Sequence, residues 1–293
     1  MIDSGSSDRS LEIVEARPWV RLHRIPNEEF GHGRTRNLGA RLASGRLVAF
    51  LTQDAIPAHS HWLREITLPL DPDGWDAVAV VGRQVARSRC FPLLKYEIRG
   101  VFSALGPDGG VTVVSRTDDE PVGSVLDQLS FYSDVNSATR RDFLLDVIPY
   151  RDLPYSEDFA FARDLILAGH RKAYAPTADV VHSNDLTLRE YRKRIFDEIV
   201  ARRRVGEQLP PLGRGTQFLR VVYGIVSDSI KIVTDHDYGA AATVGWLFRN
   251  PWYHLAKWGA TYRGTRVDLD DHRSIARQSL EHEITRKGTA TGS

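Results

Sequence analysis

The sequence predicts an α/β fold in which helices flank a mostly parallel sheet, followed by a C-terminal helical region. Short apolar runs at residues 47–51 and 77–85 have the length and composition of strands buried on both faces. Helical patterns alternate with such runs over residues 1–185. Beyond residue 185 the pattern is helical only. We therefore expect a sheet domain over residues 1–185, a helical region over 186–266 and a disordered tail over 267–293.

Composition limits the class of protein. The chain has 293 residues, 42% of them hydrophobic, which suffices for one large domain or two small ones. Its 39 basic and 38 acidic residues give a net charge of +1, so we expect no nucleic-acid partner. The single cysteine, Cys90, excludes an internal disulfide and agrees with a reducing compartment. The polar N-terminus and the lack of a long apolar run predict a cytoplasmic protein, unless it docks on a membrane surface.

The N-terminal half begins with turn chemistry and then alternates between helices and strands. The turn covers residues 3–8, and Ser6 or Ser7 would cap a short helix that ends near Ala16. A strand is expected over 19–25, a glycine-bearing loop over 30–33, and a helix over 34–43 closed by Gly45. The strand at 47–51 stops at Thr52-Gln53-Asp54. A helix over 61–70 and a buried strand over 77–85 follow.

The second half is less regular. Residues 90–129 show no clear pattern and are predicted to form a binding loop or lid. A short strand plus helix is expected over 136–145, a helix over 157–168, and two short strand segments at 172–175 and 180–182. An amphipathic, Arg-rich helix over 188–204 ends before Pro210-Pro211, and helices over 217–233 and 240–262 follow.

Asp54 is the first candidate for chemistry. It follows a buried strand, so we expect it at the carboxyl end of that strand, where open α/β sheets bind ligands. With Gln53 it offers oxygen ligands of the kind that Mg²⁺ or Mn²⁺ prefers when bridging phosphates. The alternative is a helix cap, because Pro57 and a helix follow, and the two interpretations stand about even.

Three further groups are candidates at other strand and helix ends. Arg34, Arg36 and Asn37 lie behind two glycines, where a helix N-terminus and arginines could hold phosphate, although an exposed helix face is the simpler interpretation.

Glu157 and Asp158 begin a helix, where the dipole stabilises carboxylates, but a carboxylate there could also act as a general base. His182 ends an apolar segment and is a ligand candidate if it shares an edge with Asp54; a lone histidine is otherwise more often structural. Together the candidates suit transfer chemistry on a diphosphate substrate.

As a set, these motifs resemble family 2 glycosyltransferases. The segment Asp3-Ser4-Gly5-Ser6-Ser7-Asp8 resembles the family's Asp-Xaa-Gly-Ser-Xaa-Asp turn, and Arg36-Asn37-Leu38-Gly39 its Arg-Asn-Xaa-Gly helix. Thr52-Gln53-Asp54 is similar to the Asp-Xaa-Asp segment in its rhamnosyltransferase-like variant. The resemblance extends over residues 2–185 and includes three later segments: Asp134 to Arg141, Ser156-Glu157-Asp158 and Val181-His182-Ser183.

The resemblance implies a GT-A fold, a divalent metal (Mg²⁺ or Mn²⁺) and inverting transfer of a sugar from a nucleotide-diphosphate donor to an acceptor hydroxyl. The implied acceptor is a saccharide or a lipid-linked molecule of cell-envelope polysaccharide synthesis, and the style of the Thr-Gln-Asp segment favours rhamnose as the sugar. The implied residue roles are as follows: metal ligands Asp54 and His182; general base Asp158; donor binding by Asp3, Arg36, Asn37, Gln53 and Asp54; acceptor side Glu157 and Asn136.

The chain departs from the family pattern in two places. Thr52 stands where the pattern has its first acid, so metal binding would depend on fewer charges. The family's first strand, first helix and most of its second strand would precede Asp3. We therefore expect an N-terminally incomplete GT-A domain, with Met1 standing where a longer chain reads through.

The C-terminal helices combine aromatic and basic residues over 246–263. Such a mixture suits a membrane interface that presents a lipid-linked acceptor. Packing against the sheet domain or against a second copy is the alternative, which we favour by about two to one.

Two other functions are consistent with parts of the sequence. A nicotinamide-dependent dehydrogenase would use Gly31 and Gly33 before a helix and an acid about 20 residues on, at Asp54. Residues 26–30, however, separate the glycines from their strand, and Arg36 stands where the third glycine belongs. A non-catalytic, truncated glycosyltransferase-like binding protein is the second alternative.

Overall fold

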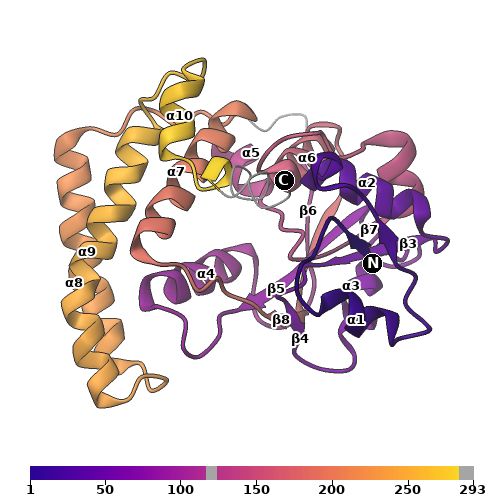
Figure 1. Cartoon of the computed structure of the whole chain (residues 1–293), viewed down its shortest axis with the longest axis horizontal. Helices are drawn as coiled ribbons and strands as arrows, with labels where there is room; N and C mark the ends of the chain where they lie inside the picture. The colour runs from indigo at the N-terminus through magenta and orange to yellow at the C-terminus, as the bar shows by residue number, and fades with distance from the viewer. Residues whose placement is uncertain (117–123, 284–293) are drawn as a thin grey trace.

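The computed structural model describes residues 1–116 and 124–283, and it shows a sheet with flanking helices joined to a set of C-terminal helices (Figure 1). The central sheet has six strands in the order β3-β7-β5-β8-β4, with β6 beside β8. Their bounds are β3 Leu47–Leu51, β4 Ile56–Pro57, β5 Ala79–Val85, β6 Thr112–Val114, β7 Asn136–Arg140 and β8 Lys172–Val181. The predicted α/β architecture is confirmed.

The sheet is built around its longest ladder, the parallel pair β5–β8. Strand β7 lies between β3 and β5 and pairs antiparallel with both, so β3, β5 and β8 run in one direction. Strands β4 and β6 pair antiparallel with the two ends of β8. Residues 52–54 follow β3 and residues 182–184 follow β8, so both segments lie at the carboxyl ends of these strands, on the same side of the sheet. The short strand β4 pairs with β8 there.

Both faces of the sheet are covered by apolar side chains, which explains the apolar composition of the first half of β5, residues 79–82. Successive residues of a strand point to opposite faces. Val81 accordingly packs with Phe161 and Leu165 of α6 (Glu157–Leu167), whereas Val80 packs with Ile66 of α3 (Trp62–Thr67) and Leu70.

The N-terminal elements form a small unit beside the main sheet. Strand β1 (Ile2–Asp3) pairs in parallel with β2 (His23–Arg24) in a separate two-stranded sheet, with α1 (Ser10–Glu15) between them. The strand predicted over 19–25 thus shrinks to two residues. Helix α2 (His32–Leu42) follows Gly31 and starts close to the predicted position.

The middle of the chain is more regular than its sequence indicates. Within residues 90–129, Pro92–Leu105 forms the 14-residue helix α4, Thr112–Val114 forms β6 and Ser124–Leu129 forms α5; residues 117–123 lie outside the described part. The prediction of an irregular segment over 90–129 was therefore wrong. Pro92 occupies the first turn of α4, where its missing N–H costs nothing, and marks a helix start.

Strand β8 is one ten-residue strand instead of two short segments. Its pairing with β5 shifts register between Gly82 and Gln84, opposite residues 176–179 of β8. Pro176 lies in this irregular stretch, where a residue without an N–H is tolerated. The bulge lets the strand continue to Val181, which places His182 at its end.

The C-terminal helices pack on one another and on α4. Helix α7 (Leu188–Arg204) starts with a reciprocal capping box between Thr187 and Glu190. It is followed by α8 (Arg214–Thr234), α9 (Ala240–Gly264) and α10 (His272–Gln278). The ring of Phe91, just before α4, lies 5.2 Å from that of Tyr191 on α7 and 4.8 Å from that of Tyr253 on α9.

The predicted disordered tail is wrong for its first part. Ile275 of α10 is buried against Phe196 and Val200 of α7 and Ala260 of α9. Residues 284–293 lie outside the described part of the chain. The domain boundary at residue 185 stays a prediction.

Candidate functional site

Asp54 and His182 are neighbours at one edge of the sheet. The Oδ2 atom of Asp54 lies 3.2 Å from Nε2 of His182. Strand β4 explains the approach, because Ile56 pairs with Val181 and so holds the segment after Asp54 against the end of β8. The backbone N–H of His182 also donates to the carbonyl of Val85 at the end of β5.

The second ring nitrogen of His182 is held by Gln84. Oε1 of Gln84 lies 3.0 Å from Nδ1, and the Gln84 amide nitrogen donates to Oγ of Ser133 at 2.9 Å. Because the amide nitrogen is used on Ser133, its oxygen faces the ring and selects the tautomer with hydrogen on Nδ1. Burial is the main cause that lowers the pKa of His182, and the Asp54 carboxylate opposes it. A neutral imidazole with a lone pair on Nε2 results.

This pair fits a divalent cation. A lone pair on Nε2 and a carboxylate oxygen face each other at 3.2 Å, an arrangement that a shared cation stabilises. Two adjacent ligands of an octahedral ion at about 2.1 Å would lie about 3 Å apart. The Asp54 side chain is 42% exposed, which leaves the open side that a metal shared with a phosphate needs. The buried hydroxyl of Thr52, at the end of the same strand, has no hydrogen-bond partner among the described residues.

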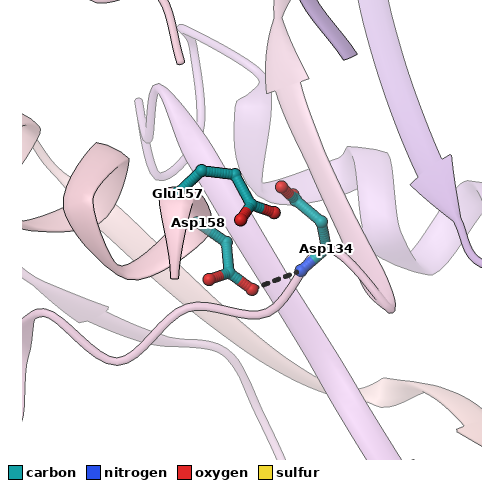
Figure 2. A group of neighbouring side chains, drawn as sticks. All are labelled: Asp134, Glu157 and Asp158. Carbon is teal, nitrogen blue, oxygen red and sulfur yellow. Dashed lines mark hydrogen bonds between the residues drawn. The ribbon is translucent and has the colours of Figure 1, made fainter. Parts of the chain in front are cut away.

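Three carboxylates form a second cluster. Asp134 precedes β7, and Glu157 and Asp158 begin α6; each offers an oxygen within 4.8 Å of the others (Figure 2). The backbone N–H of Asp134 faces Asp158 Oδ2 at 3.4 Å, and that of Phe159 donates to Asp158 Oδ1 at 2.8 Å. Three acids so close together need compensating positive charge or protons.

Arg36 supplies that charge to two of the three acids. Its Nε lies 3.1 Å from Asp134 Oδ2, and its Nη1 pairs with Glu157 Oε1. Burial acts to lower the pKa of Arg36, but Asp134 and Glu157 outweigh it and raise that pKa. Tyr150 and Ser137 donate hydroxyl hydrogen bonds to the other oxygen of Asp134 at 2.7 and 2.6 Å. Arg36 is thus engaged by carboxylates, and its contacts differ from the predicted donor contact.

Asp158 is the member of the cluster that holds a proton near neutral pH. Its pKa is raised to about 8, chiefly by burial and then by the negative charges of Glu157 and Asp134. The pKa of Glu157 is also raised by burial, but Arg36 pulls it back. A cluster in which neighbours separate the pKa values of carboxyl groups is typical of acid–base chemistry.

The two clusters are joined by hydrogen bonds. Gln84, which holds His182, donates to Ser133. The next residue, Asp134, contacts Asp158 through its backbone N–H. Asp54 and His182 therefore lie at the same edge of the sheet as the segment that carries Asp134 and contacts Asp158.

Of the other predicted donor-binding residues, Asp3 and Asn37 make hydrogen bonds within the protein, whereas Gln53 is exposed. Asp3 ends β1, and its carboxylate accepts from the N–H of Gly5 at 3.0 Å and from the N–H and hydroxyl of Ser6. The Ser6 hydroxyl is the main cause that lowers the pKa of Asp3. Gln53 is exposed beside Asp54. Asn37 has a structural use, because its side chain exchanges two hydrogen bonds with the backbone of Tyr150 at 2.8 and 3.1 Å.

Asn136 does not face an acceptor. It is fully buried in β7, accepts from the indole of Trp62 at 2.8 Å, and donates to the carbonyls of Arg83 and Ala178. Its amide fills the bulge between β5 and β8, where the strands leave carbonyls without ladder partners. The acceptor-side assignment of Asn136 was wrong for this reason.

Sequence reasoning missed three side chains near the site. Gln84 has no sequence signal, since it is one polar residue in a strand. Arg87 donates to the carbonyl of Asp54 at 2.6 Å and to that of Ser183, so it ties the segment after β3 to the segment after β8. Arg194 of α7 lies 4.4 Å from the ring of Tyr155, and its charge also acts on His182.

Helix α2, which carries Arg36, depends on a glycine contact. A Cβ on Gly33 would overlap the carbonyl oxygen of Arg151. We expect Gly33→Ala to lower the free energy of unfolding by roughly 1–3 kcal/mol, because backbone cannot move aside cheaply. Gly100→Ala in α4 is the control, since its Cβ would meet no atom within 4 Å, and it should stabilise by up to about 1 kcal/mol. Urea titration measures both, and equal effects would contradict the packing argument.

Comparison with known proteins agrees with these motifs. The model of glycosyl transferase family 2 matches residues 1–147. The chain is 31% identical over 200 residues to the O-antigen chain rhamnosyltransferase RfbN of Salmonella typhimurium and 32% identical over 200 residues to WbaN of Salmonella anatum. Each alignment covers 67% of this chain and 60% of the relative, so the chain spans less than two thirds of these relatives.

Among solved structures, a mannosyltransferase from Pyrobaculum calidifontis is similar, with 17% identity and a TM-score of 0.43. The alignment covers 99% of this chain and 69% of that one. The family model matches half of the chain and includes the turn at Asp3, the helix of Arg36 and the strand before Asp54. On that match, the chain belongs to glycosyl transferase family 2.

Proposed function

We propose that the protein is an inverting glycosyltransferase that moves a sugar from a nucleotide-diphosphate donor to an acceptor hydroxyl. The observation that carries the proposal is that a possible metal-binding pair and a carboxyl group with a raised pKa lie at the same end of the strands. Asp54 and His182 lie 3.2 Å apart and would hold a cation between them, and Asp158, a carboxyl with a pKa of about 8, is linked to them through the Ser133–Asp134 segment. Family membership supports a nucleotide-sugar donor.

The metal would be held by Asp54 and His182. When bound, Mg²⁺ or Mn²⁺ supplies positive charge to the diphosphate that leaves the sugar. Gln84 keeps Nε2 of His182 free of hydrogen for this role, and Arg87 fixes the backbone of Asp54. Asp3, at the end of β1, and Gln53, next to Asp54 in the chain, are the remaining proposed donor contacts.

Asp158 would act as the general base. The acceptor oxygen forms a bond to the anomeric carbon while the bond from that carbon to the diphosphate oxygen breaks. The electron pair of the broken bond leaves with the nucleoside diphosphate, and the acceptor proton goes to a carboxylate oxygen of Asp158. Because entry and departure occur on opposite sides of the anomeric carbon, the configuration inverts. Arg36 pairs with Glu157 and Asp134, and the negative charges of these two side chains help to raise the pKa of Asp158.

The two relatives named as O-antigen chain rhamnosyltransferases support rhamnose as the sugar and a cell-envelope saccharide or lipid-linked acceptor. We further propose a cytoplasmic location with peripheral contact to the inner face of the membrane. The dehydrogenase alternative is not supported, because the chain belongs to family 2 and Gly33 packs on the backbone of Arg151.

A donor panel tests the proposal. The protein is incubated with Mn²⁺ and nucleotide-diphosphate sugars, rhamnose included, and release of nucleoside diphosphate is followed with and without a lipid-linked saccharide fraction. We expect acceptor-dependent release with one sugar class and loss of release when the metal is chelated. Donor binding without release under any condition would favour the non-catalytic binding protein instead.

A further inference from the structure

The outward sides of α8 and α9 carry an exposed apolar surface, which we call the α8–α9 face. Its residues on α8 recur at helical spacing: Phe218, Leu219, Val222, Val226, Ile230 and Val233. On α9 the members are Val244, Phe248, Trp252 and Leu255. Phe248 is 77% exposed and Trp252 62% exposed. An apolar surface of this extent on one side of a protein marks an interaction site.

The opposite sides of the same helices are tightly joined. The Asn250 amide donates to the carbonyl of Ile225 at 2.9 Å, and His254 Nε2 lies 3.1 Å from Asp228 Oδ2. Gly224 lies directly against the ring of His254. The two helices therefore form a fixed pair at the edge of the molecule farthest from the N-terminal strands (Figure 1). The apolar residues need no rearrangement to become available.

Within α8 and α9 the exposed charges have one sign, and the two acids of the turn between them, Asp235 and Asp237, pair with Lys95. Helices α8 and α9 are described throughout, and their single acidic residue, Asp228, is buried between His254 and Lys231. The exposed charges are basic and sit beside aromatic rings: Arg220 lies 4.9 Å from the ring of Trp258, and Arg249 lies 5.2 Å from that of Trp246. Apolar, aromatic and basic residues without exposed acids are the composition of helices that lie in an anionic lipid interface.

A second copy of the chain fits this face less well. In a two-fold symmetric dimer the same patch meets itself, so the arginines of one copy would approach those of the other with no exposed acid from α8 or α9 between them. An anionic lipid surface instead offers negative charge to the arginines and acyl chains to Phe248 and Trp252. None of the described helices is long and apolar enough to span a membrane, so the contact would be peripheral.

We propose that the α8–α9 face docks the enzyme on an anionic membrane surface. The inference deepens the proposed function, on which it rests for its purpose, by naming the surface through which a lipid-linked acceptor is reached. Helix α7 makes the connection: Ile199 packs on Gly264 of α9, and Arg194 lies over Tyr155 beside the carboxylate cluster. The active site would thus stand one helix away from the lipid.

Vesicle sedimentation tests the docking without donor or acceptor. The full chain is mixed with vesicles of phosphatidylcholine alone or with phosphatidylglycerol added. We expect binding to the mixed vesicles that weakens at high salt, because the attraction between exposed charges is screened. The double variant F248E/W252E should reduce the partition coefficient by at least about tenfold, since two large apolar side chains no longer enter the lipid. W19E is the matched control, because Trp19 is also 77% exposed but lies outside the face.

Circular dichroism and donor affinity check that F248E/W252E is folded, and both should match the unmodified chain. Equal sedimentation with both lipid mixtures, or an F248E/W252E variant that binds as well as the parent, overturns the inference. A dimer that F248E/W252E converts to monomer, with no vesicle binding by the parent, assigns the face to a second copy and also overturns it. If the unmodified chain binds the mixed vesicles but shows no transferase activity with any donor, the proposed function is refuted and the docking inference stands.

Discussion

Replacing Asp158 with asparagine should lower kcat by roughly 10²–10⁴-fold while donor affinity stays unchanged. Asparagine keeps the size of the side chain and can still accept from the N–H of Phe159, but it cannot take the acceptor proton. Nucleoside-diphosphate release measures turnover, and calorimetric titration measures donor binding. Asp164→Asn is the matched control, because Asp164 lies on the same helix and pairs with Arg151 outside the cluster. Undiminished turnover in Asp158→Asn would remove Asp158 from the base role.

The raised pKa of Asp158 predicts how the transfer rate and the stability of the protein depend on pH. The base must be ionised, so the rate should rise with pH and level off above about 8. The folded state binds the Asp158 proton more tightly than the unfolded chain, whose carboxyl titrates at about 3.9. The stabilisation from this proton is therefore full below about 4 and is lost as the pH rises through 8. Asp158→Asn should raise Tm relative to the parent at pH 8 and above, and an unchanged or lowered Tm would contradict the burial argument.

Removing Asp54 should abolish metal binding at the proposed pair. With Asp54→Ala we expect the Mn²⁺-dependent increase in Tm to disappear and kcat to fall at least about 100-fold, since the leaving diphosphate loses its cation. Thermal unfolding with and without Mn²⁺, followed by turnover at saturating Mn²⁺, measures both effects. Asp73→Ala, an exposed aspartate on a remote turn, is the control. Retention of the Mn²⁺ effect in Asp54→Ala would place the metal elsewhere, with the Asp134 cluster as the next candidate.

Two substitutions of Gln84 test, in the same assay, whether this residue positions His182 for metal binding. Gln84→Leu removes the acceptor that fixes hydrogen on Nδ1 of His182, and loss of such a partner typically weakens metal binding by about 10–100-fold. Gln84→Glu keeps an oxygen in that place and should retain most of the affinity. Equal losses in both variants would show a packing effect instead of control of the tautomer.

Several parts of the fold could be predicted from the local pattern of apolar and polar residues in the sequence. The bounds of β3 and α7 agree with the sequence prediction because a buried strand and an amphipathic helix leave their periodicity in adjacent residues. The order of strands also led to the expectation that Asp54 and His182 share an edge, and they are in contact. Helix α4 was missed although Pro92 in its first turn marks a helix start, and its apolar residues contact both the sheet domain and α9.

What the sequence determined by itself was the family, the α/β class and the residue types at the strand and helix ends. The tertiary structure alone decided how those residues are used. It commits Arg36 to Asp134 and Glu157, buries Asn136 in a bulge, brings Gln84 to His182, and raises the pKa of Asp158. The physical reason is distance along the chain: secondary structure follows from neighbours within a few residues, whereas burial, ion pairing and pKa depend on groups that only folding brings together.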